Sequence, residues 1–286
     1  MNSQPIKITE CPRDAMQGIH DFIPTELKAA YINLLLQVGF DTIDFGSFVS
    51  PKAIPQMQDT AAVLRKLELG NTRSKLLAIV ANYRGAEDAA EYDEISYLGY
   101  PFSISETFQL RNANSTIQHA FDTVKQIQEL CTIKEKELLV YLSMGFGNPY
   151  GDEWNVEIVQ QWSEKLTREG IKTIALSDTV GVATPQQIAD IYPALCTAFP
   201  QTEFGLHLHA TPDNWHDKID TAYKSGCRRF DSAIKGYGGC PMAADELTGN
   251  IATENLVTYL EQQNEPTGLN MDKFREAMEY SGKVFL

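Results

Sequence analysis

The chain alternates along its whole length between short apolar segments and longer segments with helical periodicity. The short segments have strand length, and eight of them occupy residues 6–10, 42–46, 75–81, 101–105, 138–143, 172–176, 203–209 and 229–234. Strand-length runs that alternate with helical segments are typical of parallel strands joined by helices. The pattern therefore predicts eight successive strand–helix units.

Several helical segments have clear boundaries. Apolar residues over 27–38 recur every 3.6 residues and stop before Gly39, and residues 117–127 carry a second such stripe. Thr184 is followed by a proline and then by a glutamine at the third position, which is a capping box with proline in the first turn. Thr253 begins a further predicted helix. These boundaries support the alternating order.

The eight units predict an α/β fold, namely a (β/α)8 TIM barrel with a C-terminal capping helix. We expect one catalytic domain over residues 1–286, with the barrel at about 6–263 and the cap at about 264–286, its helix near 272–280. An open, doubly wound sheet is the alternative. No Gly-x-Gly-x-x-Gly motif follows the first segment, which weakens a dinucleotide-binding version of that alternative.

The charge balance narrows the classes of partner. The chain has 24 basic and 38 acidic residues, a net charge of −14, which disfavours nucleic acid and anionic membranes. An anionic substrate would then need a local positive centre, either a metal ion or a buried arginine. No apolar run approaches the ~20 residues of a membrane span, and the N-terminus lacks signal-peptide features, so a cytoplasmic location is expected.

The five cysteines are scattered and show no Cys-x-x-Cys spacing, which argues against a disulfide framework or a structural zinc site. Four of them, Cys11, Cys131, Cys196 and Cys227, are expected to be structural.

His207 and His209 end the seventh predicted strand with one leucine between them. Residues two apart on a strand face the same side, so both imidazoles point one way. Two such imidazoles form half of a metal site. Two hydrogen-bonded histidines inside the barrel are the alternative.

Further ligand types follow other predicted strands. Asp14 could supply a carboxylate and Asn250 an amide oxygen to the same ion as the histidines. Two nitrogen and two oxygen ligands with open positions suit Mg²⁺ or Mn²⁺. Zn²⁺ is the competing choice, since two histidines and one carboxylate also bind catalytic zinc. A turn or helix cap is the alternative role for Asp14.

Arg13 adjoins Asp14, and a permanently charged planar donor can hold a developing oxyanion. An ion pair with Asp44 across neighbouring strands is the alternative, and the two roles are compatible if the carboxylate aims the guanidinium.

Polar side chains gather at the predicted carboxyl ends of at least six strands, where barrel enzymes place their reactive groups. Besides those above, the group includes Gln17, Ser47, Tyr141, Asp178 and Thr179. Lys52, Asn82 and Arg84 are further rim positions that could contact the substrate.

Cys240 follows three glycines of a short loop, Gly236, Gly238 and Gly239. Glycines let such a loop hinge, and a thiol exposed there could exchange a proton with a substrate carbon. An incidental loop cysteine is the alternative.

The chain resembles the 3-hydroxy-3-methylglutaryl-CoA lyases of the DRE-TIM metallolyase superfamily over about residues 6–263. The resemblance is carried by Pro12-Arg13-Asp14, Ser47-Phe48-Val49-Ser50-Pro51-Lys52 with Pro55-Gln56-Met57, Asp178-Thr179-Val180-Gly181 with Thr184-Pro185, His207-Leu208-His209, and Gly238-Gly239-Cys240-Pro241 with Gly249-Asn250.

The resemblance implies a TIM barrel that binds a divalent metal through Asp14, His207, His209 and Asn250. It implies cleavage of 3-hydroxy-3-methylglutaryl-CoA, or a close homologue, to acetyl-CoA and acetoacetate, which in related proteins belongs to leucine degradation. Arg13 would hold the thioester oxygen, and Cys240 would handle the proton of the acetyl-CoA carbanion. Asp178 and Ser47 would line the acyl pocket, and related barrels often pair as homodimers.

Four features depart from the pattern of the resemblance. Asp44 stands in place of a glutamate, and Ala210 replaces an aspartate after the second histidine. Met144 and Asn148 occupy the places of two cysteines, and the segment from Cys240 to Asn250 is one residue longer. None of these changes removes a predicted metal ligand or the thiol.

Two other functions remain open on the same barrel. One is an acyltransferase that condenses acetyl-CoA with an oxo acid, although such synthases usually carry a further C-terminal domain. The other is a silent metal-binding barrel that serves as an interaction module. The retained Arg13, Asp14, His207, His209 and Cys240 speak against a silent site.

Overall fold

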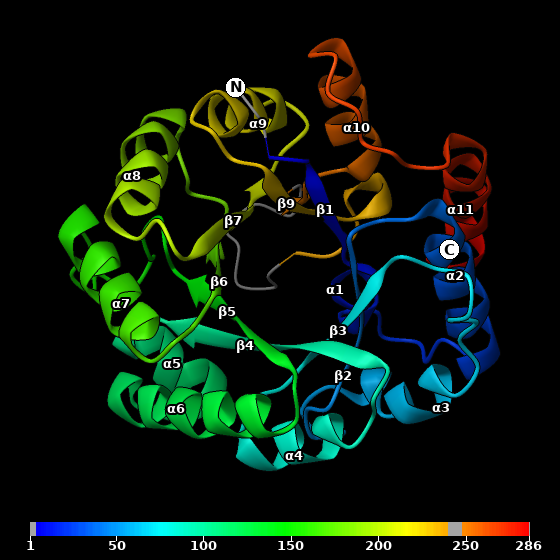
Figure 1. The fold of residues 1–286 in the computed structure, drawn as a ribbon, viewed down its shortest axis with the longest axis horizontal. Coiled ribbons are helices and arrows are strands. Elements are labelled where there is room, and N and C mark those ends of the chain that lie inside the picture. Colours follow the sequence, from blue (N-terminus) through cyan, green and yellow to red (C-terminus); the bar gives the residue numbers. More distant parts are fainter. Residues whose placement is uncertain (1–3, 240–247, 286) are drawn as a thin grey trace.

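The computed structural model describes residues 4–239 and 248–285 and shows a ring of helices around a closed barrel of parallel strands (Figure 1). The strand order around the barrel is β1-β2-β3-β4-β5-β6-β7-β9. These strands are β1 Lys7–Glu10, β2 Thr42–Ser47, β3 Lys75–Ile79, β4 Ile95–Ser103, β5 Glu137–Ser143, β6 Thr173–Ser177, β7 Glu203–His207 and β9 Arg229–Ser232. The predicted (β/α)8 barrel is confirmed.

The helices follow the strands in the predicted alternation. They are α1 Pro12–Gln17, α2 Thr25–Val38, α3 Thr60–Leu64, α4 Tyr83–Ala90, α5 Glu106–Ala113, α6 Ile117–Ile133, α7 Val156–Arg168, α8 Pro185–Ala198, α9 Trp215–Lys224, α10 Thr253–Gln262 and α11 Met271–Val284, with 3₁₀ turns η1 Pro55–Met57 and η2 Ile234–Gly236. Gly39 ends α2 with φ +82°, and Thr184 and Gln187 form the expected capping box of α8.

The fourth strand begins six residues before its predicted start at residue 101. Proline inside a central strand removes a ladder hydrogen bond. The last pair of β4 with β3 is Gly99 with Ile79, and beyond it β4 pairs with β5 alone. One side of the strand is therefore free of ladder bonds at Pro101.

The seventh predicted strand is not continuous. β7 ends at His207, and His209 belongs to β8 His209–Ala210, which pairs antiparallel with β10 Gly249–Asn250. This short ladder needs partners 39 and 41 residues apart in sequence, so a local pattern does not reveal it. It brings Asn250 directly opposite His209.

The helix predicted near residues 272–280 is present as α11. It lies between α10 and α2 in the outer ring rather than across an end of the barrel (Figure 1). Tyr31 of α2 stacks on Tyr280, and Phe40 contacts Phe274 edge-on. Apolar burial against α2 therefore fixes its place.

Glu10 is a buried carboxyl at the end of β1 that ties the last strand–helix unit to the first. Its two oxygens accept hydrogen bonds from the Ile234 N–H at 2.8 Å and the Thr253 hydroxyl at 2.6 Å. Burial raises the pKa of Glu10 to about 8, although these two hydrogen bonds act to lower it.

We expect Glu10→Gln to stabilise the protein at pH 8 and to leave stability nearly unchanged at pH 5. A raised folded pKa contributes stability that is present below the unfolded value of 4.5 and is lost as pH rises to about 8. The loss amounts to at most about 5 kcal/mol, and a glutamine amide can still accept from Ile234. Urea unfolding at both pH values measures the effect. Exposed Glu261→Gln on α10 is the control, and identical pH profiles for wild type and Glu10→Gln would contradict the expectation.

Candidate active site

Three potential metal ligands meet at the carboxyl end of the barrel. Asp14 lies on α1, directly after β1, while His207 ends β7 and His209 lies on β8. Ligand atoms of these three side chains all lie within 4.8 Å of one another. Opposite ligands of one ion are about 4.2 Å apart, so these separations are close to those of a shared site.

The two histidine rings are oriented by different acceptors. Nδ1 of His207 lies 3.1 Å from a carboxylate oxygen of Asp231, and Nδ1 of His209 lies 3.2 Å from the carbonyl oxygen of Thr179. Nε2 of His209 is buried and has no hydrogen-bond partner among the described residues. A buried nitrogen without a hydrogen-bond partner, beside a carboxylate, is suited to bind a cation.

The pKa shifts of Asp14 and His209 favour the protonation states that bind a metal cation. Burial alone would raise the pKa of Asp14, but Arg13 and the two histidines outweigh it and lower that pKa to about 2. Burial and the neighbouring His207 lower the pKa of His209 to about 4. A carboxylate that stays ionised and an imidazole that stays neutral near pH 7 are both in the form that binds metal.

Asn250 contacts Asp14 through its amide nitrogen. Nδ2 donates to Asp14 Oδ2 at 2.7 Å and to the Tyr237 carbonyl at 2.9 Å. The predicted ligand atom, the amide oxygen, thus does not face Asp14 in this structure. Asn250 joins the group, and a ligand role requires its amide to turn.

The ion pair between Arg13 and Asp44 is present. Nε of Arg13 donates to both oxygens of Asp44, at 3.2 and 3.0 Å, and Nη1 donates to Asp14 Oδ1 at 3.0 Å. Asp44 is fully buried, so its carboxylate contacts this arginine and is shielded from solvent. The shorter side chain at position 44 therefore still reaches Arg13.

Gln17 and Tyr141 line the same group. Gln17 accepts from Arg13 Nη1 and donates to Asp14 Oδ1, both at 2.9 Å. The Tyr141 ring packs edge-on against His207 with centroids 5.7 Å apart, and its hydroxyl is buried without a hydrogen-bond partner in the described chain. These two of the predicted substrate-binding residues thus lie beside the candidate metal ligands.

Three other predicted residues have structural partners. Ser47 Oγ donates to the Ile79 carbonyl, Thr179 Oγ1 accepts from the Met144 N–H, and the Asn82 side chain caps α4. Lys52 and Arg84 lie exposed on the surface. Cys240 lies outside the described residues.

Asp178 forms a buried ion pair that supports His209. One oxygen accepts from Lys218 Nζ at 2.7 Å and the other accepts from the Ala183 N–H at 2.8 Å. Lys218 Nζ also donates to the His209 carbonyl at 2.7 Å. With both oxygens engaged and no exposed surface, Asp178 holds the turn beside His209.

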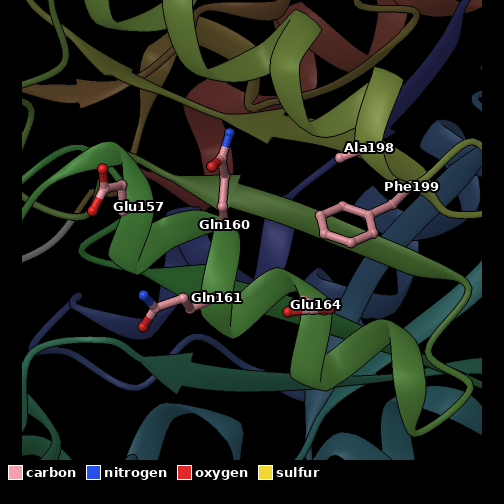
Figure 2. A pocket seen from close by; sticks show the side chains of 6 residues that line it. All are labelled: Glu157, Gln160, Gln161, Glu164, Ala198 and Phe199. Atoms are coloured by element: carbon pink, nitrogen blue, oxygen red, sulfur yellow. The ribbon is translucent and has the colours of Figure 1, made fainter.

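A cavity of about 350 Å³ lies elsewhere, between α7 and the end of α8. Figure 2 shows its lining, which comes from the outer ring of helices and not from the carboxyl ends of the strands. Its residues are Glu157, Gln160, Gln161, Glu164, Ala198 and Phe199. It shares no residue with the candidate site.

Sequence reasoning missed two residues of this region, Asp231 and Lys218. Asp231 is the cross-strand partner of His207 in the barrel register, a signal that the predicted strands 203–209 and 229–234 could have given. Lys218 lies on α9, where nothing local distinguishes it from an exposed lysine, yet it is buried.

Together these features define a (β/α)8-barrel enzyme whose carboxylate and two histidines form a candidate divalent-metal centre at the carboxyl ends of the strands. No helix in the described part of the chain is both long enough and apolar enough to cross a membrane.

Comparison with known proteins identifies the family. The HMGL-like family model matches residues 6–280. Hydroxymethylglutaryl-CoA lyase YngG of Bacillus subtilis (strain 168) is 35% identical over 271 residues, which cover 94% of this chain and 89% of the relative. The human cytoplasmic 3-hydroxy-3-methylglutaryl-CoA lyase is 32% identical over 283 residues, covering 98% of this chain and 75% of the relative.

Solved structures of similar proteins support the same family. The HMG-CoA lyase of Bacillus subtilis superposes with a TM-score of 0.92 at 33% identity, covering 100% of this chain and 95% of that one. The HMG-CoA lyase of Acinetobacter baumannii, solved with coenzyme A and 3-methylmalate, gives 0.91 at 30% identity, covering 100% and 92%. The chain therefore belongs to the HMGL-like family, and it is a carbon–carbon lyase.

Proposed function

We propose that this protein is a divalent-metal-dependent lyase that cleaves 3-hydroxy-3-methylglutaryl-CoA, or a close homologue, to acetyl-CoA and acetoacetate. The observation that carries the proposal is the meeting of Asp14, His207 and the unpaired Nε2 of His209 beside Arg13. The names of the relatives support the substrate class, and the coenzyme A in one of their structures supports an acyl-CoA.

The proposed ligands are Asp14, His207, His209 and, after its amide turns, Asn250. When bound, a divalent ion supplies Lewis-acid polarisation of substrate oxygens. Two oxygens and two nitrogens with open positions favour Mg²⁺ or Mn²⁺ over Zn²⁺.

The reaction is a retro-aldol cleavage. A general base takes the proton of the tertiary hydroxyl, the bond between C2 and C3 breaks, and its electron pair stays on C2 of the departing acetyl-CoA as an enolate. The hydroxyl oxygen becomes the keto oxygen of acetoacetate. Arg13 is the group that holds the enolate oxygen, because Asp44 fixes its guanidinium at the edge of the ligand group.

The neighbouring side chains shape this site. We assign Gln17 and Tyr141 to contacts with the acyl group, together with Ser47 at the end of β2 and Thr179 just after β6. Asp178 acts through Lys218 and the turn that it holds. Asn82 and the two rim cations remain the proposed contacts to coenzyme A, and a homodimer in the cytoplasm remains an expectation.

Cys240 is the proposed donor of the proton that C2 of acetyl-CoA receives. We expect Cys240→Ser to lower kcat about 100-fold, since a positioned acid typically contributes at least that factor and a serine hydroxyl is a much weaker acid. Steady-state acetyl-CoA release measures the loss. Cys131→Ser on the outer helix α6 is the matched control, and unchanged turnover in Cys240→Ser would remove the thiol from the reaction.

Activity is tested with purified protein, 3-hydroxy-3-methylglutaryl-CoA and either Mg²⁺ or Mn²⁺. Release of both acetyl-CoA and acetoacetate, lost on adding EDTA and restored by excess metal, is the expected result. Condensation of acetyl-CoA with a 2-oxo acid and no cleavage would instead establish the acyltransferase.

A further inference from the structure

Asp231 and His207 are direct neighbours across two barrel strands. They are Cα partners in the parallel pairing of β9 with β7, and Asp231 also pairs with Thr9 of β1 on its other side. Their side chains are 3% and 11% exposed, and the carboxylate oxygen lies 3.1 Å from Nδ1 of His207. The contact is therefore built into the barrel register and shielded from water.

The hydrogen bond determines which nitrogen of His207 can bind another group. A carboxylate accepts, so in the neutral ring Nδ1 carries the proton and Nε2 keeps its lone pair. For His209 the hydrogen-bond acceptor at Nδ1 is a neutral carbonyl, that of Thr179. The two rings thus share one tautomer but differ in the charge of the acceptor.

We infer that Asp231 is a positioning residue that fixes the tautomer and ring orientation of His207 for metal binding. The inference rests on the proposed metal role of His207. Partners of this kind typically contribute 10- to 100-fold to metal affinity, because they hold the ring in place and raise its basicity.

A competing arrangement uses the same residues. Cys11, His207 and Asp231 also have ligand atoms within 4.8 Å of one another, so the alternative is that Asp231 is itself a metal ligand. The described geometry favours positioning, since Nδ1 faces Asp231 at hydrogen-bond distance and Cys11 is fully buried. In the metal-free protein, a positioning role requires that Asp231 fix the tautomer of His207, whereas a ligand role does not.

The first experiment examines that metal-free protein. Long-range ¹H–¹⁵N spectra of ¹⁵N-histidine-labelled protein, with the His207 signals assigned through His207→Gln, report the tautomer. Wild type and Asp231→Asn should show His207 protonated at Nδ1, because an amide oxygen still accepts. Asp231→Leu should lose that preference, whereas His209 keeps it in all three.

The second experiment titrates the same proteins with Mn²⁺ by calorimetry. Relative to wild type, we expect about 10-fold weaker binding for Asp231→Asn and about 100-fold for Asp231→Leu. Asp59→Asn, which removes a carboxylate paired with Lys28 in the outer ring, is the control and should bind as wild type does. If Asp231→Leu does not fold, Asp231→Ala, which also removes the acceptor of the His207 Nδ1 hydrogen bond, takes its place in both experiments.

The outcomes separate this inference from the proposed function. Failure of the wild type to bind Mn²⁺ would overturn the proposed function, whatever the tautomer spectra show. Unchanged affinity in the Asp231 variants would overturn the inference. Weakened affinity with an unchanged His207 tautomer in Asp231→Leu would also overturn it, because Asp231 would then act as a ligand.

Discussion

Replacement of His209 by alanine is expected to abolish Mn²⁺ binding and to reduce lyase turnover to background. The reason is that His209 supplies the one imidazole nitrogen of the site that is buried with no hydrogen-bond partner in the described chain. A bound ion stabilises the wild type by about 2.7 kcal/mol at 100 times its dissociation constant. The variant should lose this increment completely, and thermal unfolding with and without Mn²⁺ measures it.

His119→Ala is the matched control, because His119 lies exposed on α6. It should keep both the metal-dependent stabilisation and turnover. The metal-free unfolding temperature of His209→Ala should fall, because a buried ring and its Nδ1 contact with the Thr179 carbonyl are lost, so the increment due to Mn²⁺ is compared within each variant. Full stabilisation by Mn²⁺ in His209→Ala would exclude this histidine as a ligand.

Arg13→Met is expected to lower kcat about 1,000-fold with a much smaller change in Mn²⁺ affinity. Loss of one preorganised donor to an oxyanion typically costs 100- to 1,000-fold in rate. Arg13 is the one cationic side chain that the described contacts place against Asp14. The measurements are steady-state kinetics and a parallel metal titration.

The variant leaves the Asp44 carboxylate buried without its cation, which would destabilise the fold. The double variant Arg13→Met/Asp44→Asn removes both charges and should show the same loss of kcat in a more stable protein. Arg73→Met, which removes a guanidinium bonded to the Gly39 and Gly268 carbonyls, should be fully active. Near-normal kcat in the double variant would show that no oxyanion depends on Arg13.

Most of the barrel could be predicted from sequence because its helices and strands are determined by patterns of neighbouring residues. Strand-length apolar runs, the stop at Gly39 and the capping box at Thr184 each depend on a few neighbouring residues. The helix α1 was not predicted, since its six residues are too few to show a period. The break after His207 was missed as well, because it depends on pairing with distant Asn250.

The candidate site followed from one rule, that reactive groups lie at the carboxyl ends of barrel strands. The rule brought Asp14, His207 and His209 together, as the structure shows. The rule does not predict side-chain direction. It therefore did not predict that Asn250 faces Asp14 with its amide nitrogen rather than its oxygen. It also could not distinguish a rim residue from a buried ion pair, which is the setting of Asp178.

Anomalous scattering from a crystal of the Mn²⁺-loaded protein tests the proposed centre most directly. We predict a single strong manganese peak at about 2.0–2.2 Å from a carboxylate oxygen of Asp14 and from Nε2 of both His207 and His209. A peak elsewhere, or none at saturating Mn²⁺, would contradict the shared metal site on which the proposed reaction depends.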